Sequence, residues 1–185
     1  MFMGTWWWRS VLFLDVCSEI STIWIFGSVR LKGILMSKKS MWSYLKLDSF
    51  DIEIPYSQSK DLLISFLREK KISFDTPTEM QVIIKSKMFS LDANFFIAFH
   101  FNGEKLIAIT IAPDVVLEGS ALYCRYNYVQ GALENELGRP HNRLRFILDL
   151  LDPDSRLSRW QRNDIKVEHY LLNRFGMEEV INIKL

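Results

Sequence analysis

The chain has 185 residues, of which 49% are hydrophobic and 24% are charged, a composition typical of one globular domain. Its 23 basic and 22 acidic residues give a formal net charge of +1, so we expect no global attraction to nucleic acid or to an anionic membrane. Two cysteines, Cys17 and Cys124, are too few for a disulfide framework, which favours a reducing, cytoplasmic location.

The first 35 residues do not resemble the rest of the chain. They hold four of the six tryptophans, and their apolar residues follow neither a helical nor a strand period. Acidic residues interrupt the apolar run, which argues against a signal peptide and a membrane-spanning helix. The codons for Lys32-Gly33 can form a purine-rich ribosome-binding sequence just upstream of Met36, as expected if translation begins at Met36. We therefore predict that residues 1–35 are a doubtful leader, either a start codon placed too early or a genuine appended segment.

Residues 36–185 are predicted to form a single domain whose first half is a strand, a helix and three strands. Ser57 or Ser59 can cap the helix, which should end near Lys71 with Leu62, Leu63, Phe66 and Leu67 on its apolar face. The next three strands are predicted at Met80–Lys85, after the break at Thr76-Pro77, at Phe95–Phe101, whose residues alternate between two faces, and at Glu104–Ala112. Asn102-Gly103 is a strong signal for a two-residue hairpin between the last two.

The second half repeats this plan. Ser120 can cap a helix that Gly138 and Pro140 end, with an inner face formed by Leu122, Tyr126, Val129 and Leu133. The strands that follow are predicted at Ser158–Arg162, Ile165–Leu172 and Glu179–Lys184, with Asn163-Asp164 as the turn between the first two.

The order β-α-βββ-α-βββ predicts the α+β class. We expect a mostly antiparallel sheet of about six strands, with the two main helices on one face. Because the second helix lies between strands of different hairpins, one connection must cross the sheet.

No spacing in the chain indicates catalysis or metal binding. His100, His141 and His169 lack the spacing of a helical zinc site, and we expect His100 to be a polar residue on a sheet face. Cys124 is expected to be a small buried hydrophobic residue. Phosphate-binding glycine loops are absent from the sequence. We therefore predict no catalytic, cofactor-binding or metal-binding residue and no cofactor.

Residues 139–162 mix arginine with apolar and aromatic residues, a composition enriched at protein interfaces. The alternative is that 144–151 form a short helix that covers one end of the core. Trp160 and Tyr170, on neighbouring strands, are predicted to form an exposed aromatic pair. The candidate interface residues are Arg143, Arg145, Phe146, Arg156, Arg159, Trp160 and Tyr170.

These observations favour a small cytoplasmic protein-binding module without catalytic activity. By analogy of size and class alone, it would be of the bacterial immunity type, which binds and neutralises a toxin. We expect a protein partner, and neither nucleic acid nor a membrane. The alternative is a small-ligand-binding or enzymatic domain with a pocket between sheet and helices, lined by Tyr123, Tyr126, Tyr128 and His100.

Overall fold

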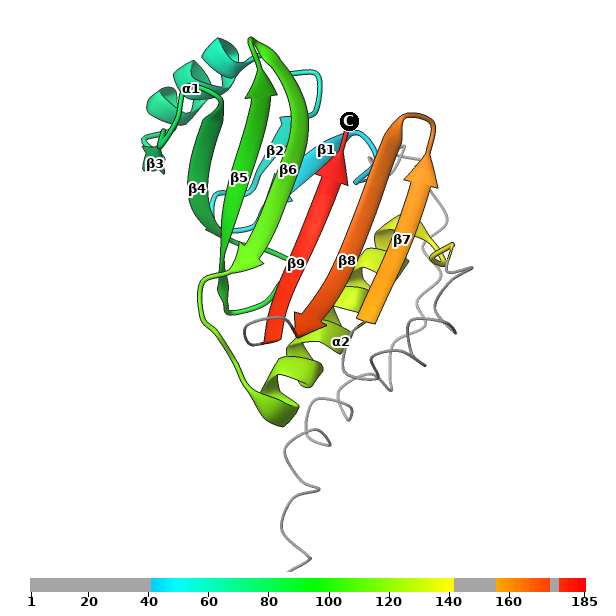
Figure 1. The fold of residues 1–185 in the computed structure, drawn as a ribbon. Coiled ribbons are helices and arrows are strands. Elements are labelled where there is room, and N and C mark those ends of the chain that lie inside the picture. Colours follow the sequence, from blue (N-terminus) through cyan, green and yellow to red (C-terminus); the bar gives the residue numbers. More distant parts are fainter. Residues whose placement is uncertain (1–40, 142–155, 174–176) are drawn as a thin grey trace, which may run out of the picture. The chain divides into compact units, whose positions relative to one another are not determined.

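A computed structural model of the chain describes residues 41–141, 156–173 and 177–185 (Figure 1). The chain divides into two units, residues 1–37 and 38–185, and all described residues belong to the second. The predicted leader at residues 1–35 lies outside the described residues and stays a prediction. Among the described residues, no helix combines the length and the apolar character needed to span a bilayer.

The described residues form nine strands and two helices. In chain order they are β1 (Tyr44–Leu47), β2 (Ile52–Pro55), α1 (Lys60–Glu69), β3 (Phe74–Asp75), β4 (Gln81–Lys87), β5 (Asn94–Asn102), β6 (Lys105–Pro113), α2 (Gly119–Leu137), β7 (Arg156–Arg162), β8 (Ile165–Asn173) and β9 (Met177–Lys184).

Seven of these strands form one antiparallel sheet in the order β3-β4-β5-β6-β9-β8-β7, while β1 and β2 pair separately. The last strand, β9, lies between β6 and β8, because the connection that contains α2 joins β6 to β7 and leaves the positions of β9 and β8 to be filled later. The predicted α+β class, the mostly antiparallel sheet and the crossing connection are confirmed. The sheet has seven strands instead of about six because the two-residue β3 adds an edge beside β4.

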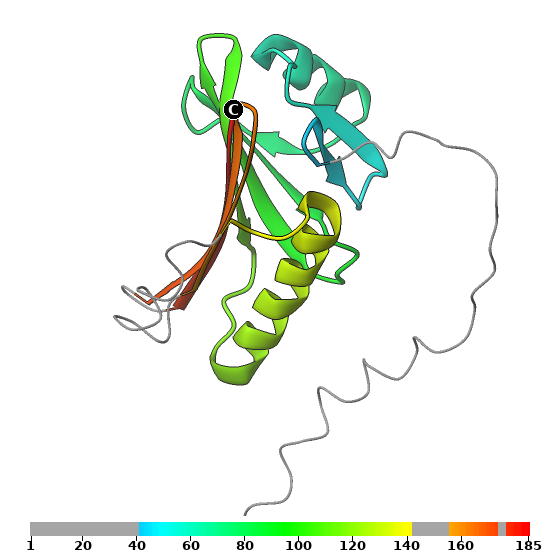
Figure 2. The same cartoon turned by 90° about the vertical axis from the view of Figure 1, so that its right-hand side faces the viewer.

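The elements are arranged in two layers. Figure 2 shows the sheet nearly edge-on, with α1, α2 and the β1–β2 hairpin all on one side of it. We call this side of the sheet the inner face and the opposite side the outer face. Of the helices and strands that the structure describes, none covers the outer face.

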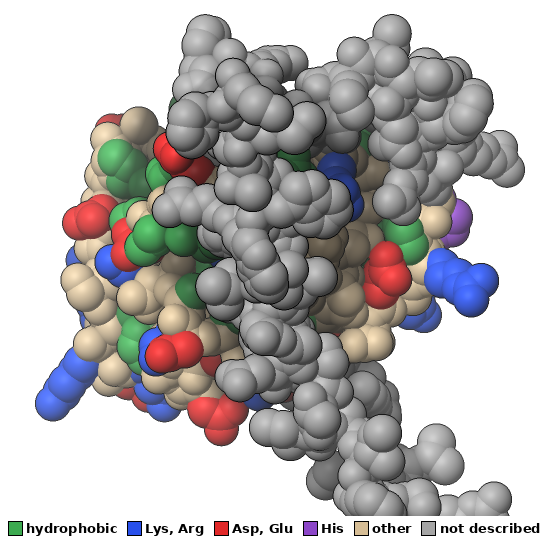
Figure 3. Space-filling model, turned by 90° about the horizontal axis from the view of Figure 1, so that it is seen from below, with side chains coloured by type: hydrophobic (Ala, Val, Ile, Leu, Met, Phe, Trp, Pro, Cys, Tyr) green, Lys and Arg blue, Asp and Glu red, His purple; other side chains and the backbone are tan. Residues whose placement is uncertain are grey.

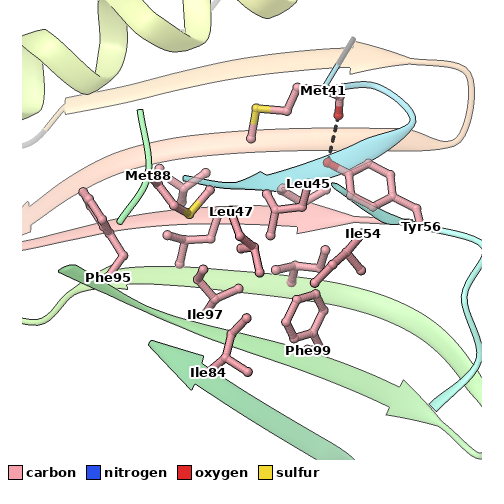
Figure 4. Close-up of a cluster of buried hydrophobic side chains, with 14 of the residues drawn as sticks. Met41, Leu45, Leu47, Ile54, Tyr56, Ile84, Met88, Phe95, Ile97 and Phe99 are labelled. Atoms are coloured by element: carbon pink, nitrogen blue, oxygen red, sulfur yellow. Dashed lines mark hydrogen bonds between the residues drawn. The ribbon is translucent and has the colours of Figure 1, made fainter. Parts of the chain in front are cut away.

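The core fills the space between the inner face and the elements that cover it. Leu45, Leu47 and Ile54 of the β1–β2 hairpin lie against Ile97 and Phe99 of β5 (Figure 4). All five side chains are fully buried, and each contributes roughly 1.5–3 kcal/mol through removal of apolar area from water. The hairpin therefore belongs to the same core as the sheet.

The N-terminus of α1 follows the predicted chemistry, while the helix ends at Glu69, two residues before the predicted Lys71. Ser59 is its N-cap, and its hydroxyl oxygen accepts a hydrogen bond from Leu62 N at 3.4 Å. The turn of the β5–β6 hairpin adds a second cap, because the Glu104 carboxylate accepts from Asp61 N at 3.1 Å. Leu63 and Leu67 are buried as predicted, but Leu62 is 63% exposed, so the apolar face is narrower than expected.

The four residues predicted for the inner face of α2 are all buried. The predicted cap at Ser120 is wrong. The helix begins one residue earlier, at Gly119, after Glu118, whose side chain makes no capping hydrogen bond. Gly119 has a φ of +55°, which a glycine adopts without strain and which turns the chain into the helix before Ser120 is reached.

Candidate functional site

The outer face is the surface that these elements leave open to a partner. Because successive residues of a strand point to opposite faces, each strand contributes every second residue to it. On β5, β6, β9 and β8 these residues are a mixture of polar and apolar side chains, and they include Phe96, which is 44% exposed. The outer face is therefore mixed in chemistry, in contrast to the apolar inner face.

Five polar side chains on neighbouring strands form a continuous row across the outer face. Gln81 Nε2 donates to His100 Nδ1 at 3.1 Å, and His100 Nε2 donates to Thr110 Oγ1 at 3.1 Å. The Thr110 hydroxyl donates to Asn182 Oδ1 at 3.0 Å, and Asn182 Nδ2 donates to the Tyr170 hydroxyl at 3.0 Å. The row spans β4, β5, β6, β9 and β8, and every bond in it runs in the same direction.

This row requires a neutral His100, because Nδ1 must accept while Nε2 donates. Partial burial lowers the pKa of His100, which supports that state. Each side chain in the row is held by its neighbour, so the outer face presents a fixed pattern of polar groups. Little side-chain conformational entropy would therefore be lost if a partner bound them. The prediction that His100 is a polar residue of a sheet face is confirmed.

Beside the polar row lies a charged cluster built around Glu168, a 9% exposed residue of β8. Its Oε1 accepts from Arg159 Nε at 2.9 Å and lies 2.9 Å from Lys166 Nζ, and its Oε2 lies 3.4 Å from Lys184 Nζ. Burial alone would raise the pKa of Glu168, but the hydrogen bonds from Lys166 and Arg159, together with the charge of Lys184, hold it below its ordinary value. Three cations around one carboxylate leave this part of the outer face positive.

The structure separates the interface residues that the sequence grouped together. Arg159 and Tyr170 lie on the outer face. Arg156 lies on the inner face, where its guanidinium stands 5.2 Å from the ring centroid of Tyr123. Arg143, Arg145 and Phe146 lie outside the described residues, so their part in an interface stays a prediction.

The predicted exposed pair of Trp160 and Tyr170 is wrong. Trp160 is fully buried on the inner face, and its Nε1 donates to the carbonyl oxygen of Gly138 at 2.7 Å. The register explains the difference, because Trp160 pairs with Val167 while Tyr170 pairs with Leu157. Directly opposite residues share a face, so Trp160 and Tyr170 point in opposite directions.

A second concentration of ionisable groups is buried between α2 and the inner face. Arg125 Nε donates to Glu179 Oε2 at 2.7 Å, and Glu179 Oε1 lies 3.1 Å from His169 Nε2. On the other side of the ring, His169 Nδ1 lies 2.9 Å from Gln130 Oε1. The ring of Tyr126 stacks on the imidazole with the centroids 4.2 Å apart. This network links α2, β8 and β9.

The sequence holds one signal for this network. Val167 and Leu171 identify the inward positions of β8, and His169 lies between them at the same spacing. A polar residue at an inward position needs a buried partner. The partners of His169, Gln130 and Glu179, come from α2 and β9, so no local spacing reveals them.

Two further expectations are corrected. Cys124 is exposed instead of buried. The residues predicted to line one pocket do not share a face, because His100 lies on the outer face whereas Tyr126 is buried on the inner one. Tyr128 is 43% exposed on α2. The set of residues on which the pocket alternative depended is therefore not brought together.

Neither the charged side chains of the described residues nor comparison with known proteins assigns a catalytic role to a residue. Within residues 41–141, 156–173 and 177–185, no group of three or more His, Cys, Asp or Glu side chains could hold a metal ion. At the end of the molecule shown in Figure 3, basic and acidic side chains lie near one another over the described surface. Comparison with family models, curated proteins and solved structures finds no match for the chain.

Proposed function

We propose that the protein is a small cytoplasmic protein-binding module without catalytic activity, and that it binds its partner with the outer face of the sheet. The observation that carries this proposal is the hydrogen-bonded row from Gln81 to Tyr170, which fixes polar side chains over five strands on a face that no described element covers. Pre-ordered side chains favour binding, because less conformational entropy is lost on association.

The charged cluster indicates the chemistry of the partner. Arg159, Lys166 and Lys184 surround a single carboxylate, and their side chains are 39%, 30% and 58% exposed. An acidic protein surface would complement the remaining positive charge and would be steered toward it during encounter. Arginine and tyrosine are also the residues most enriched among energetically important interface positions, and Arg159 and Tyr170 supply both.

The test removes the positive charge without disturbing the sheet. In the double variant Lys166→Gln/Lys184→Gln, Glu168 keeps Arg159 as its partner, so the fold should be retained. The matched control is Lys70→Gln/Lys71→Gln, which removes the same charge at the end of α1.

Tagged protein purified from its native cells under mild conditions should carry one stoichiometric partner. We expect that partner to bind Lys166→Gln/Lys184→Gln roughly tenfold more weakly than the wild type, and we expect this difference in affinity to shrink as the salt concentration is raised. The control variant should bind as tightly as the wild type. Recovery of no stoichiometric partner, or equal weakening by the two variants, would contradict the proposal.

The finer proposal is that the partner is a toxin which this protein neutralises in a bacterial cell. The size, the α+β class and the three cations around Glu168 on the outer face support it. It predicts that a toxin gene lies beside this gene, and that expression of the toxin arrests growth only when this protein is absent. Unchanged growth of a deletion strain that expresses the neighbouring gene would refute the neutralising role.

A further inference from the structure

The two halves of α2 are held by different amounts of apolar contact. Val129 and Leu133, in the second half, belong to the main hydrophobic core. Leu122 and Tyr126, in the first half, belong to a separate small cluster with Leu171 of β8. The first turn also lacks a side-chain cap and acidic residues. Few buried apolar contacts and an uncapped end are the features of a segment that opens locally at low free energy.

The buried polar network fastens this first half to the sheet together with that small cluster and with Arg156 of β7, which lies over the ring of Tyr123. Arg125 donates to Glu179 through Nε and to the carbonyl oxygen of Val115 through Nη1 at 2.8 Å, which ties the helix both to β9 and to the preceding loop. Glu179 in turn contacts His169 of β8. The ring of His169 is fully buried beneath Tyr126, so opening this half of the helix is what brings the imidazole into water.

The charges around His169 disfavour a protonated ring. Within the part of the chain that the structure describes, Glu179 is the one buried carboxylate beside the ring, and Arg125 already binds that carboxylate. A protonated imidazole would therefore place two buried cations on one anion. Of the described residues, the groups around the ring come from three elements. Helix α2 supplies Arg125, Tyr126 and Gln130, with the exposed Glu134 behind Gln130. Strand β9 supplies Glu179, and β7 supplies Ser158 and, on the far side of Tyr126, Arg156.

A neutral ring fits the network with one adjustment. It donates from Nε2 to Glu179 and needs a donor at Nδ1, which a half-turn of the Gln130 side-chain amide supplies. That turn sacrifices the hydrogen bond from Gln130 Nε2 to Glu134 at the surface. Burial, opposed in part by Glu179, lowers the pKa of His169. The closed arrangement therefore takes up a proton less readily than a solvated histidine does.

We propose that His169, Glu179 and Arg125 form an acid-sensitive latch, which holds the first half of α2 on β8 and β9 near neutral pH and releases it on acidification. In the open form the imidazole is solvated and takes up a proton below about pH 6.5, whereas the closed form resists it. The ratio of open to closed molecules rises as the pH falls, by up to tenfold per pH unit, until the closed form is also protonated.

Hydrogen exchange of the full chain between pH 8 and pH 5, corrected for the intrinsic effect of pH on exchange, tests the latch. Protection of residues 119–126 should fall below about pH 6.5, while residues 129–137 of the same helix, anchored in the main core, keep theirs. The variant His169→Gln should lose this pH dependence, and His141→Gln, at an exposed histidine, should keep it. Constant protection of residues 119–126, or an equal loss in both halves, would overturn the proposal.

A second measurement needs no variant and so does not depend on whether His169→Gln folds. Titration of the histidine ring resonances of the wild-type protein by NMR should give His169 a pKa below the ordinary value of a solvated histidine, about 6.5. A pKa of His169 at or above that value would overturn the latch, because acid would then not weaken the closed form.

Discussion

The buried pair of Arg125 and Glu179 offers the most quantitative test of the inner network. Their side chains are 9% and 2% exposed, and Nε lies 2.7 Å from Oε2. The change Arg125→Met keeps most of the side-chain volume and removes the cation, which leaves the Glu179 carboxylate buried beside a neutral imidazole. We expect a large loss of stability from this one change.

The magnitude follows from the burial. At an effective dielectric constant of about 20, two unit charges about 4 Å apart attract by roughly 4 kcal/mol. Breaking a buried pair by removing one partner destabilises proteins by about 3–5 kcal/mol, because an uncompensated charge stays buried. Adding Glu179→Gln removes that charge and keeps an amide of nearly the same shape. The effects of the two changes should therefore fail to add, with a coupling free energy of roughly 0.5–3 kcal/mol.

Urea unfolding of the wild type, the two single variants and the double variant at pH 7.5 measures each free energy of unfolding. The matched control is Lys46→Met, which removes a cation from an exposed pair with Asp51 and should change stability by less than about 1 kcal/mol. If Arg125→Met proved as mild as Lys46→Met, or if the effects of Arg125→Met and Glu179→Gln simply added, the reasoning would be refuted.

Trp160→Phe should lower the free energy of unfolding by roughly 1–3 kcal/mol, because it opens a cavity and leaves the carbonyl oxygen of Gly138 without its donor. The control Tyr128→Phe, on the exposed side of α2, should leave the free energy of unfolding almost unchanged. Equal effects in urea unfolding would show that Trp160 is not anchored as described. Gly138→Ala should destabilise by about 1–3 kcal/mol, because Gly138 has a φ of +84°. Gly131→Ala, where an added Cβ meets nothing within 4 Å, should stabilise by about 0.5–1 kcal/mol, and thermal unfolding of both variants checks the opposite signs.

Local signals predicted the turns and the element types well. Asn163-Asp164 joins β7 and β8 as predicted, and Asn163 has a positive φ. The predicted Asn102-Gly103 turn is wrong by one residue, because Asn102 pairs with Lys105, so the turn is Gly103-Glu104 and Gly103 supplies the positive φ. These features depend on neighbouring residues alone. The place of β9 between β6 and β8 depends on pairing between distant segments, so only the crossing of the sheet could be inferred, and not the order of its strands.

Two of the errors were avoidable from the sequence. A two-residue turn at Asn163-Asp164 pairs Arg162 with Ile165, and counting outward pairs Trp160 with Val167, which places Trp160 on the inner face. Cys124 lies two residues after Leu122, about 200° around the helix, so it points away from the buried side. The contacts of His169 were not avoidable in this way, because they join residues from α2, β8 and β9.

The central claim is that the outer face of the sheet binds a protein. A photoreactive phenylalanine analogue placed at Gln161, an exposed outer-face residue directly opposite Lys166, tests it in living cells. The same analogue at Tyr128, on the helix that covers the inner face, is the matched control. We expect one cross-linked protein from position 161 and none from position 128. Cross-linking from position 128 alone, or from neither position, would contradict it.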